Sequence, residues 1–267
     1  MFDSGVGGLT VLHECLVSLP EEDFVYLGDT AMFPYGTRDP ARLRERIAAI
    51  SRRLLGEEKA KLLVIACNTA TSIGTDVARE VASEHGVEVV PVVEPQAEIA
   101  AAITDSGKVG VLATPNTVES GAYRRALETQ GRTLEVTEVA ARDLAPFIQE
   151  GSFFDQEVLD MARAYCAPLK RAEVDTLILG CTHYPLVAPM LQRILGRDVR
   201  LVSGGHAVAA AVQRTLESAG LARRADGEGE YRFLCTGEVE SFRELGTRFL
   251  QMPLGAVERI ELPATAP

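Results

Sequence analysis

The chain lacks several features that would assign it to a specialised class of protein. Its 267 residues contain no apolar run long enough to cross a bilayer. The N-terminus has no basic segment followed by an apolar one, so we expect a cytoplasmic protein of one large or two small domains. Basic residues are too few to balance the acidic ones. The net charge of −11 argues against binding to nucleic acids or anionic membranes.

Cysteine and lysine are also scarce. The five cysteines form no CxxC pair, which argues against a disulfide framework or a zinc ribbon, and we expect no metal site. Of the lysines, Lys61 and Lys108 precede predicted strands, the wrong end of a sheet for a ligand. Lys59 and Lys170 lie late in predicted helices or just after them. None suits the Schiff base of pyridoxal phosphate, so we expect no cofactor.

Short apolar runs alternate with amphipathic helical stretches along most of the chain. Several of these runs are continuously apolar, as is typical of parallel strands buried on both faces. This alternation predicts an α/β fold with parallel sheets. The predicted strands are Phe24–Leu27, Leu62–Cys67, Val87–Val93, Val109–Ala113, Thr133–Val139, Thr176–Cys181, Val199–Val202 and Tyr231–Cys235. The predicted helices are Arg42–Leu55, Val118–Leu127, Gln156–Leu169, Leu186–Leu195 and Ala207–Ala219.

Two segments of the chain resemble each other. The run ending in Cys67 and the run ending in Cys181 are both apolar strands, each followed by small polar residues and then a predicted helix. Two such copies predict two similar α/β domains related by a pseudo-two-fold axis, with a site in the cleft between them. Proline and glycine interrupt the pattern near residues 94–95 and 203–205. We therefore predict a discontinuous first domain of residues 1–94 and 205–267, and a second domain of residues 95–204.

Two facing cysteines suggest a chemistry. Ligands of parallel α/β sheets bind beyond the carboxyl ends of the strands, where both cysteines lie. Inversion of an α-carbon removes a proton from one face and delivers a proton to the other, which two opposed thiols could do. A helix N-terminus lowers the pKa of a thiol and binds anions. The same amides, with the hydroxyls of Ser4, Thr69 and Thr182, could therefore hold substrate carboxylates.

Simpler interpretations of these residues stay open on this evidence. A lone cysteine that ends an apolar strand is usually a small buried hydrophobe, and we assign Cys15, Cys166 and Cys235 to packing. His183 could be a core residue, and Asp3 could cap a helix. A cysteine hydrolase that uses one cysteine with His183, or an amino-acid-binding module whose cysteines only pack, are the alternative functions.

Four motifs together resemble glutamate racemases of the aspartate/glutamate racemase superfamily. They are DSGVGGLTV from Asp3, PYG from Pro34, CNTA from Cys67 and GCTHYP from Gly180, and the resemblance continues in order to residues 233–237. It implies two α/β domains with the active site between them. It also implies a cofactor-independent isomerase that interconverts L- and D-glutamate and supplies D-glutamate for peptidoglycan. Aspartate or another amino acid is the alternative substrate, and a homodimer is expected.

The resemblance also assigns roles to residues of this chain. Cys67 would act on the D-isomer and Cys181 on the L-isomer, with Asp3 and His183 assisting the neighbouring thiols. Asp29 would be peripheral to the same pocket. The implied substrate-binding residues are Asp3, Ser4, Tyr35, Gly36, Asn68, Thr69, Thr114, Thr117, Thr182 and His183.

Three positions depart from the family pattern. The family usually has several residues before the Phe–Asp–Ser turn, where only Met1 stands here, so a start upstream stays open. A carboxylate that often follows the strand near Val139 is replaced, in an ungapped reading, by Gln149 with Glu150 beside it. We leave both out of the catalytic set. The third departure is Ser203 where Asp is common, and nothing in the sequence explains it.

Overall fold

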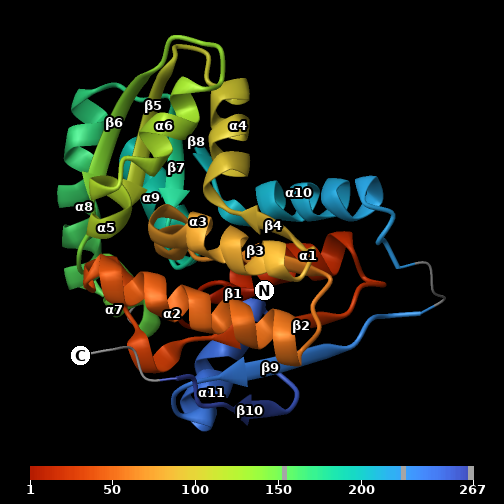
Figure 1. The fold of residues 1–267 in the computed structure, drawn as a ribbon. Coiled ribbons are helices and arrows are strands. Elements are labelled where there is room, and N and C mark those ends of the chain that lie inside the picture. The colour runs from red at the N-terminus through yellow and green to blue at the C-terminus, as the bar shows by residue number, and fades with distance from the viewer. Residues whose placement is uncertain (152–154, 224–226, 264–267) are drawn as a thin grey trace.

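The strands form two separate sheets. The computed structural model describes residues 1–151, 155–223 and 227–263. Within each sheet, all strand pairs run parallel. Figure 1 shows one sheet in each of two lobes. The predicted fold of two parallel-sheet α/β units is therefore confirmed.

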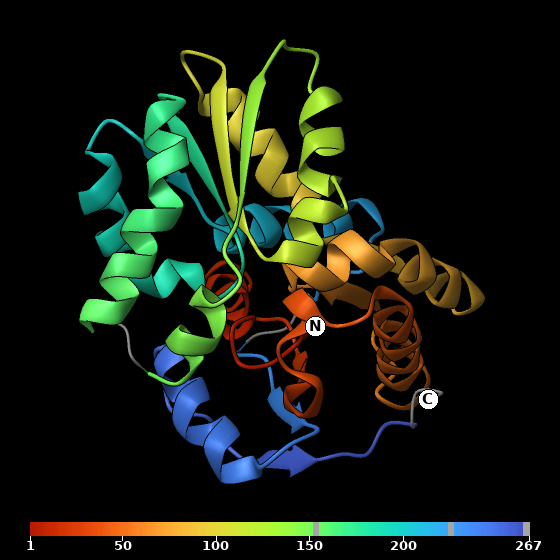
Figure 2. The same cartoon turned by 90° about the vertical axis from the view of Figure 1, so that its left-hand side faces the viewer.

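The first sheet combines both ends of the chain. Its strand order is β10-β9-β2-β1-β3-β4, and β9 pairs with β2 from Phe24↔Tyr231 to Gly28↔Cys235. Figure 2 shows the C-terminal blue segment beside the N-terminal red one. The strands are β1 (Phe2–Asp3), β2 (Phe24–Gly28), β3 (Leu62–Ile65), β4 (Glu88–Pro91), β9 (Tyr231–Cys235) and β10 (Val257–Arg259).

The second sheet is built from the middle of the chain, in the order β6-β5-β7-β8. Its strands are β5 (Lys108–Ala113), β6 (Glu135–Ala140), β7 (Thr176–Gly180) and β8 (Arg200–Val202). The central strand β7 is buried along its whole length, as its continuously apolar sequence predicts. The proposed boundaries at residues 94–95 and 204–205 fall in the first turn of α4 and at the start of α10.

Helices cover both faces of each sheet. Next to the first sheet, α2 packs on α3, and α1 packs on α10 and α11. Next to the second sheet, α4 packs on α6 and α8 packs on α9, on opposite sides (Figure 2). The α-helices are α1 (Leu9–Ser18), α2 (Pro40–Arg52), α3 (Asn68–Glu84), α4 (Val93–Ile103), α5 (Pro115–Glu119), α6 (Ala122–Glu128), α7 (Leu144–Gln149), α8 (Gln156–Arg171), α9 (Ala188–Leu195), α10 (Gly204–Ser218) and α11 (Val239–Leu250). Short turns of helix are η1 (Thr30–Met32), η2 (Tyr35–Thr37), η3 (Arg53–Glu57) and η4 (Tyr184–Val187).

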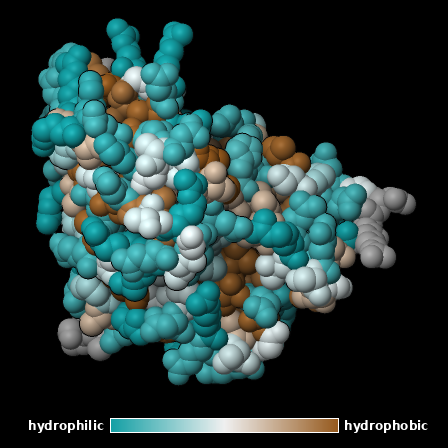
Figure 3. All heavy atoms as spheres, turned by 90° about the horizontal axis from the view of Figure 1, so that it is seen from above, coloured by the Kyte–Doolittle hydropathy of each residue, from teal (hydrophilic) through white to brown (hydrophobic). Residues whose placement is uncertain are grey.

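The hydrophobic core is continuous between the two lobes. One cluster of buried residues joins α1, α10 and α11 to the second sheet, and a separate cluster lies under α2 and α3. Hydrophilic side chains cover most of the face in Figure 3, and apolar residues appear there in small separate patches. The buried apolar side chains of the larger cluster therefore hold the two lobes together.

One predicted helix was wrong, and strand β10 was not predicted. The predicted helix Val118–Leu127 is interrupted, because Gly121 adopts φ 65° between α5 and α6, a left-handed conformation that ends a helix. Strand β10 had no apolar run to signal it, since its sequence is Val-Glu-Arg and it lies at the edge of the sheet.

Candidate active site

The two cysteines of the near-repeat line one cavity between the sheets. Cys67 follows β3 of the first sheet, and Cys181 directly follows β7 of the second. The space left between them is about 20 Å³, room for about one water molecule. The structure is therefore a closed form. The cavity is lined by Ser4, Phe33, Pro34, Tyr35, Gly36, Cys67, Asn68, Thr69, Thr114, Ala145, Cys181, Thr182 and His183.

Cys67 is the N-cap residue of α3. Its Sγ accepts a hydrogen bond from the Ala70 N–H at 3.4 Å. This contact and hydrogen bonds from Ser4 favour the thiolate, but they do not decide its titration. Burial and the nearby Asp3 carboxylate together raise the pKa of the Cys67 thiol to about 12. In the closed protein, Cys67 is therefore a protonated thiol at neutral pH.

Cys181 lies beside a histidine. Its Sγ is 3.7 Å from His183 Nδ1, and burial raises the pKa of the Cys181 thiol. The sequence predicted small polar residues after this cysteine and then a helix at Leu186–Leu195. A 3₁₀ turn occupies residues 184–187, and α9 follows from Ala188 to Leu195, two residues later than its predicted start. Pro185 and Pro189 lack the amide hydrogens that a continuous helix would use. The polar partners of Cys181 are the backbone N–H groups of His183 and Tyr184 and the imidazole of His183.

Asp3 lies behind the cavity wall on the side of Cys67. It is fully buried, and its carboxylate accepts hydrogen bonds from the Gly5 N–H at 3.0 Å and the Thr182 hydroxyl at 3.3 Å. It also hydrogen-bonds to Cys67, and burial raises the pKa of its carboxyl group. Asp3 does not cap α1, whose N-cap residue is Gly8. Its contacts therefore link the Cys67 side of the cavity to Thr182 from the other lobe.

His183 is held between two aromatic rings. The ring centroids of Phe33 and Phe249 lie 5.4 Å and 5.2 Å from that of the imidazole. Its Nε2 is 3.0 Å from the amide oxygen of Gln149 on α7. Burial lowers the pKa of His183 to about 3, so the imidazole is neutral at physiological pH. It can therefore exchange a proton with Cys181 without carrying a permanent charge.

The Tyr35–Gly36 turn is anchored from both lobes. The Tyr35 hydroxyl donates to Asp29 Oδ2 at 2.5 Å. The side-chain amide of Asn116, at the start of α5, donates to the carbonyl oxygens of Tyr35 and Arg38 at 2.9 and 2.8 Å. A Cβ on Gly36 would lie 2.5 Å from Thr114 Cβ. Only glycine allows the turn to approach the second lobe this closely.

The remaining predicted residues form hydroxyl and amide contacts across the cleft. The Thr69 and Thr114 hydroxyl oxygens are 2.9 Å apart, and Thr117 lies within 3.3 Å of both. The Asn68 amide donates to Gln96 Oε1 at 2.8 Å and to the Tyr123 hydroxyl oxygen at 2.6 Å. Asp3, Asp29 and Thr117 support the lining residues from behind, and the other predicted residues line the cavity.

Sequence reasoning missed several residues that support the site. Arg46 donates to both oxygens of the buried Asp29 at 2.8 and 2.6 Å. Gln96 and Tyr123 hold Asn68, and Phe33 covers His183. Local sequence carried no signal for any of these, because each partner comes from a distant element. Gln149 was identified as a departure from the family pattern but was left without a role.

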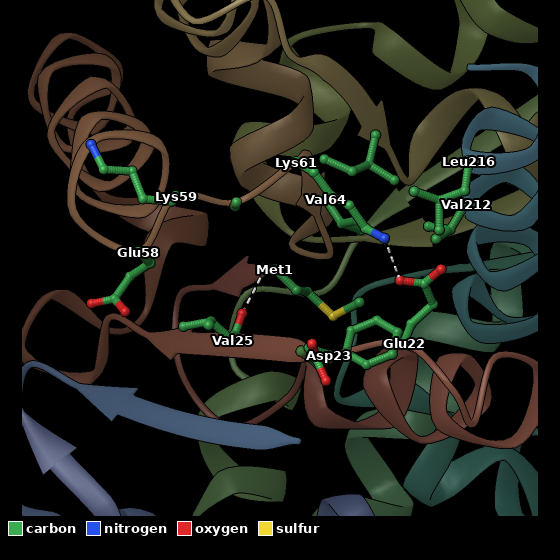
Figure 4. Close-up of a pocket in the computed structure, with 13 residues that line it drawn as sticks. Met1, Glu22, Asp23, Val25, Glu58, Lys59, Lys61, Val64, Val212 and Leu216 are labelled. Atoms are coloured by element: carbon green, nitrogen blue, oxygen red, sulfur yellow. Dashed lines mark hydrogen bonds and ion pairs between the residues drawn. The ribbon is translucent and has the colours of Figure 1, made fainter. Parts of the chain in front are cut away.

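A second cavity of about 320 Å³ lies at the opposite, amino-terminal end of β2 and β3. Figure 4 shows the Lys61 ammonium turned toward the Glu22 carboxylate, an ion pair of 2.7 Å, and the Met1 amino group donating to the Val25 carbonyl oxygen. No cysteine lines it among the described residues. Its position at the amino ends of the strands is not where parallel α/β folds bind substrates.

Across residues 1–151, 155–223 and 227–263, no three His, Cys, Asp or Glu side chains come together as a metal site. In the same part of the chain, no helix has both the length and the apolar character needed to cross a membrane.

Comparison with known proteins identifies close relatives. The family model described as Asp/Glu/hydantoin racemase matches residues 11–212. A glutamate racemase of Geobacter metallireducens is 40% identical over 99% of this chain and 96% of its own length. A glutamate racemase isoform of Bacillus anthracis has a similar structure, with a TM-score of 0.91 and 34% identity over 98% of this chain and 96% of that one. The Francisella tularensis glutamate racemase, solved in complex with D-glutamate, has a TM-score of 0.90 and 31% identity over 97% of this chain and 95% of that one.

Proposed function

The chain belongs to the glutamate racemases of the Asp/Glu/hydantoin racemase family, and we propose that Cys67 and Cys181 carry the two proton transfers of glutamate racemisation. The sequence-based prediction of a racemase is confirmed by this membership. The observation that supports the proposed mechanism is the position of the two thiols. They come from different sheets and line the same small cavity. Two acid/base groups on opposite faces of one carbon are what inversion requires.

In the proposed reaction, one cysteine is a thiolate and the other a thiol. Cys67 removes the α-proton of D-glutamate, Cys181 then delivers a proton to the opposite face, and the roles exchange for L-glutamate. Asp3, hydrogen-bonded to Cys67, and His183, 3.7 Å from the Cys181 sulfur, assist their neighbouring thiols. Proton transfer is favoured when these groups lie within hydrogen-bond reach of the sulfur they serve.

The substrate itself supplies a missing charge. In the closed, ligand-free protein, burial raises the pKa of both thiols, so neither is ionised at neutral pH. A bound amino acid brings an ammonium group next to its α-carbon. An opposite charge this close favours a thiolate. Binding of glutamate and activation of the thiol are therefore coupled, and a thiolate formed at a high pKa is a strong base for the weakly acidic α-proton.

The cavity must open to admit the substrate. Its free space of about 20 Å³ holds about one water molecule, far less than an amino acid needs. Hydrogen bonds between the lobes close it, among them those from Asn116 to the Tyr35–Arg38 segment. Relative movement of the lobes, followed by closure that excludes water, is the motion we propose.

Hydrogen exchange at the α-carbon tests the proposed mechanism. In heavy water, each glutamate enantiomer should acquire deuterium at Cα as it is converted to the other. Cys67→Ala and Cys181→Ala should each abolish inversion. Cys166→Ala, which removes a buried cysteine of α8 outside the cavity, is the matched control and should keep it. Full activity of either active-site variant would refute two-thiol catalysis.

The substrate and the reaction class each have an alternative that can be tested. Aspartate is the alternative substrate, and comparison of its turnover with that of glutamate decides between them. Trapping of an acyl-enzyme on one cysteine would instead favour a hydrolase.

We also propose that the protein acts in the cytoplasm as a homodimer and supplies D-glutamate for peptidoglycan. Sedimentation of the purified protein tests the dimer.

A further inference from the structure

The two ring nitrogens of His183 face different polar groups. Its Nδ1 faces the Cys181 sulfur at 3.7 Å and the Thr182 hydroxyl oxygen at 3.5 Å. Its Nε2 faces only the side-chain oxygen of Gln149, at 3.0 Å. Phe33 and Phe249 occupy the space around the ring. The contact with Gln149 is thus the shortest polar contact of the imidazole.

This contact determines where the imidazole carries its proton. A neutral imidazole has one N–H group and one bare nitrogen. An amide oxygen can only accept, so the hydrogen bond to Gln149 places the N–H on Nε2. The bare Nδ1 then points toward the thiol of Cys181, which can donate to it, while the Thr182 hydroxyl donates to Asp3. The ring orientation and the protonation pattern therefore agree with each other.

We propose that Gln149 is a positioning residue that selects the Nε2–H form of His183 and so presents a bare Nδ1 to the Cys181 thiol. This inference rests on the proposed two-thiol function. It assigns a role to a residue that touches neither the substrate cavity nor the sulfur. Burial also keeps the imidazole neutral, since it lowers the pKa of His183 to about 3.

The selected form allows Cys181 to be activated for L-glutamate. The S–H bond of Cys181 breaks, its proton forms an N–H bond at Nδ1, and the electron pair stays on sulfur. The thiolate then takes the α-proton of L-glutamate, and in the following step Cys67 delivers its own proton to the opposite face of the carbanion. After D-glutamate leaves, the imidazolium returns its proton through solvent to the Cys67 thiolate. With the opposite form of the imidazole, Nδ1 would carry a hydrogen and could not accept from the thiol.

Three variants separate this role from a merely structural one. Gln149→Met keeps a side chain of similar length without the hydrogen bond, and kcat/KM should fall about tenfold, the loss expected for one hydrogen bond in the reacting complex. Gln149→Glu keeps an acceptor oxygen and should retain most of the activity. Glu150→Gln, at the next and exposed position of the chain, is the control and should match the parent protein.

Isotope effects give a readout specific to the Cys181 side. The two enantiomers have equal free energy in water, so kcat/KM must fall equally in both directions. If Gln149 acts through Cys181, removal of the proton from L-glutamate becomes more rate-limiting in Gln149→Met. The primary isotope effect on kcat/KM with α-deuterated L-glutamate should then rise, and that with D-glutamate should not.

The protonation pattern can be read directly in the resting enzyme. The chain has four histidines, so a ¹⁵N-histidine spectrum assigned with His183→Gln should resolve each ring. The parent should show His183 with hydrogen on Nε2, and Gln149→Met should shift it toward Nδ1. Hydrogen on Nδ1 in the parent, or unchanged activity and isotope effects in Gln149→Met, would overturn the inference. Failure of the parent to racemise glutamate would refute the proposed function instead, because the spectrum needs no substrate.

Discussion

The buried pair of Arg46 and Asp29 should stabilise the protein far more than a surface pair on the same helix. Arg46 donates two hydrogen bonds to Asp29, whose side chain is 0% exposed, while that of Arg46 is 9% exposed. Two residues earlier on α2, Arg44 makes an equally short two-pronged contact with Asp76, but these side chains are 41% and 69% exposed. Both pairs join an arginine to an aspartate through two hydrogen bonds, from Nε and Nη2 in Arg46 and from Nη1 and Nη2 in Arg44, and they differ strongly in burial.

This difference fixes the expected magnitudes. Arg46→Leu leaves the Asp29 carboxylate buried without its cation, which should lower the free energy of unfolding by about 3–5 kcal/mol. Arg44→Leu removes an exposed pair and should lower it by less than about 1 kcal/mol. Asp29→Asn combined with Arg46→Leu removes both charges. The double variant should therefore lose less than the sum of the single variants, by about 2 kcal/mol.

Urea unfolding followed by circular dichroism measures these free energies. The same variants should be assayed with glutamate, because Asp29 accepts the hydrogen bond of the Tyr35 hydroxyl at 2.5 Å. Loss of Arg46 should therefore raise KM, whereas Arg44→Leu should not. If Arg46→Leu and Arg44→Leu lower the free energy of unfolding by amounts that agree within about 1 kcal/mol, the argument from burial is refuted.

Three further outcomes are expected. Burial raises the pKa of Cys15 to about 12 from its ordinary 9.0, so above pH 9 the unfolded chain loses a proton that the folded one keeps, and stability falls with pH. Cys15→Ala should therefore destabilise by about 1 kcal/mol less at pH 10 than at pH 7 in urea melts, and an equal penalty would contradict this. Gly7→Ala should abolish racemisation in a coupled assay, because its Cβ would lie 2.3 Å from Thr182 Oγ1, whereas Gly56→Ala, with open space around it, should be active. Asn116→Ala removes two hydrogen bonds between the lobes and should raise KM several-fold with a smaller change in kcat; an unchanged KM would argue against its role in closure.

The parts of the site that sequence reasoning located are local in the chain. Each cysteine follows a continuously apolar strand, and its polar neighbours are adjacent in sequence. The strand pattern fixes burial on both faces, and the parallel arrangement fixes which end carries the ligand. That is why Cys67 and Cys181 could be placed at a common cavity from the sequence, together with the residues that follow them.

The supporting contacts have no such local signal. Thr236 donates to Asp29 across 207 positions of the chain, and His183 meets Gln149 across 34. A glutamine in a short helix or an arginine on an amphipathic one looks like a surface residue until the fold supplies its partner. The predicted helix Leu186–Leu195 after Cys181 is present but begins two residues later, at Ala188, because a 3₁₀ turn that contains Pro185 precedes it.

The acidic composition of the protein extends to the cavity, whose lining has no permanently cationic side chain among the described residues. With a net charge of −11, the chain places no lysine or arginine among the described residues that line the cavity. The carboxylates of a substrate must therefore be held by hydroxyls and by the free amides at the start of α3, which carry partial positive charge. A fixed cation there would ionise the thiols permanently, and it would also oppose the ammonium group of the substrate. Without one, burial keeps both thiols protonated in the resting protein, and we expect the ammonium group of bound glutamate to favour the thiolate.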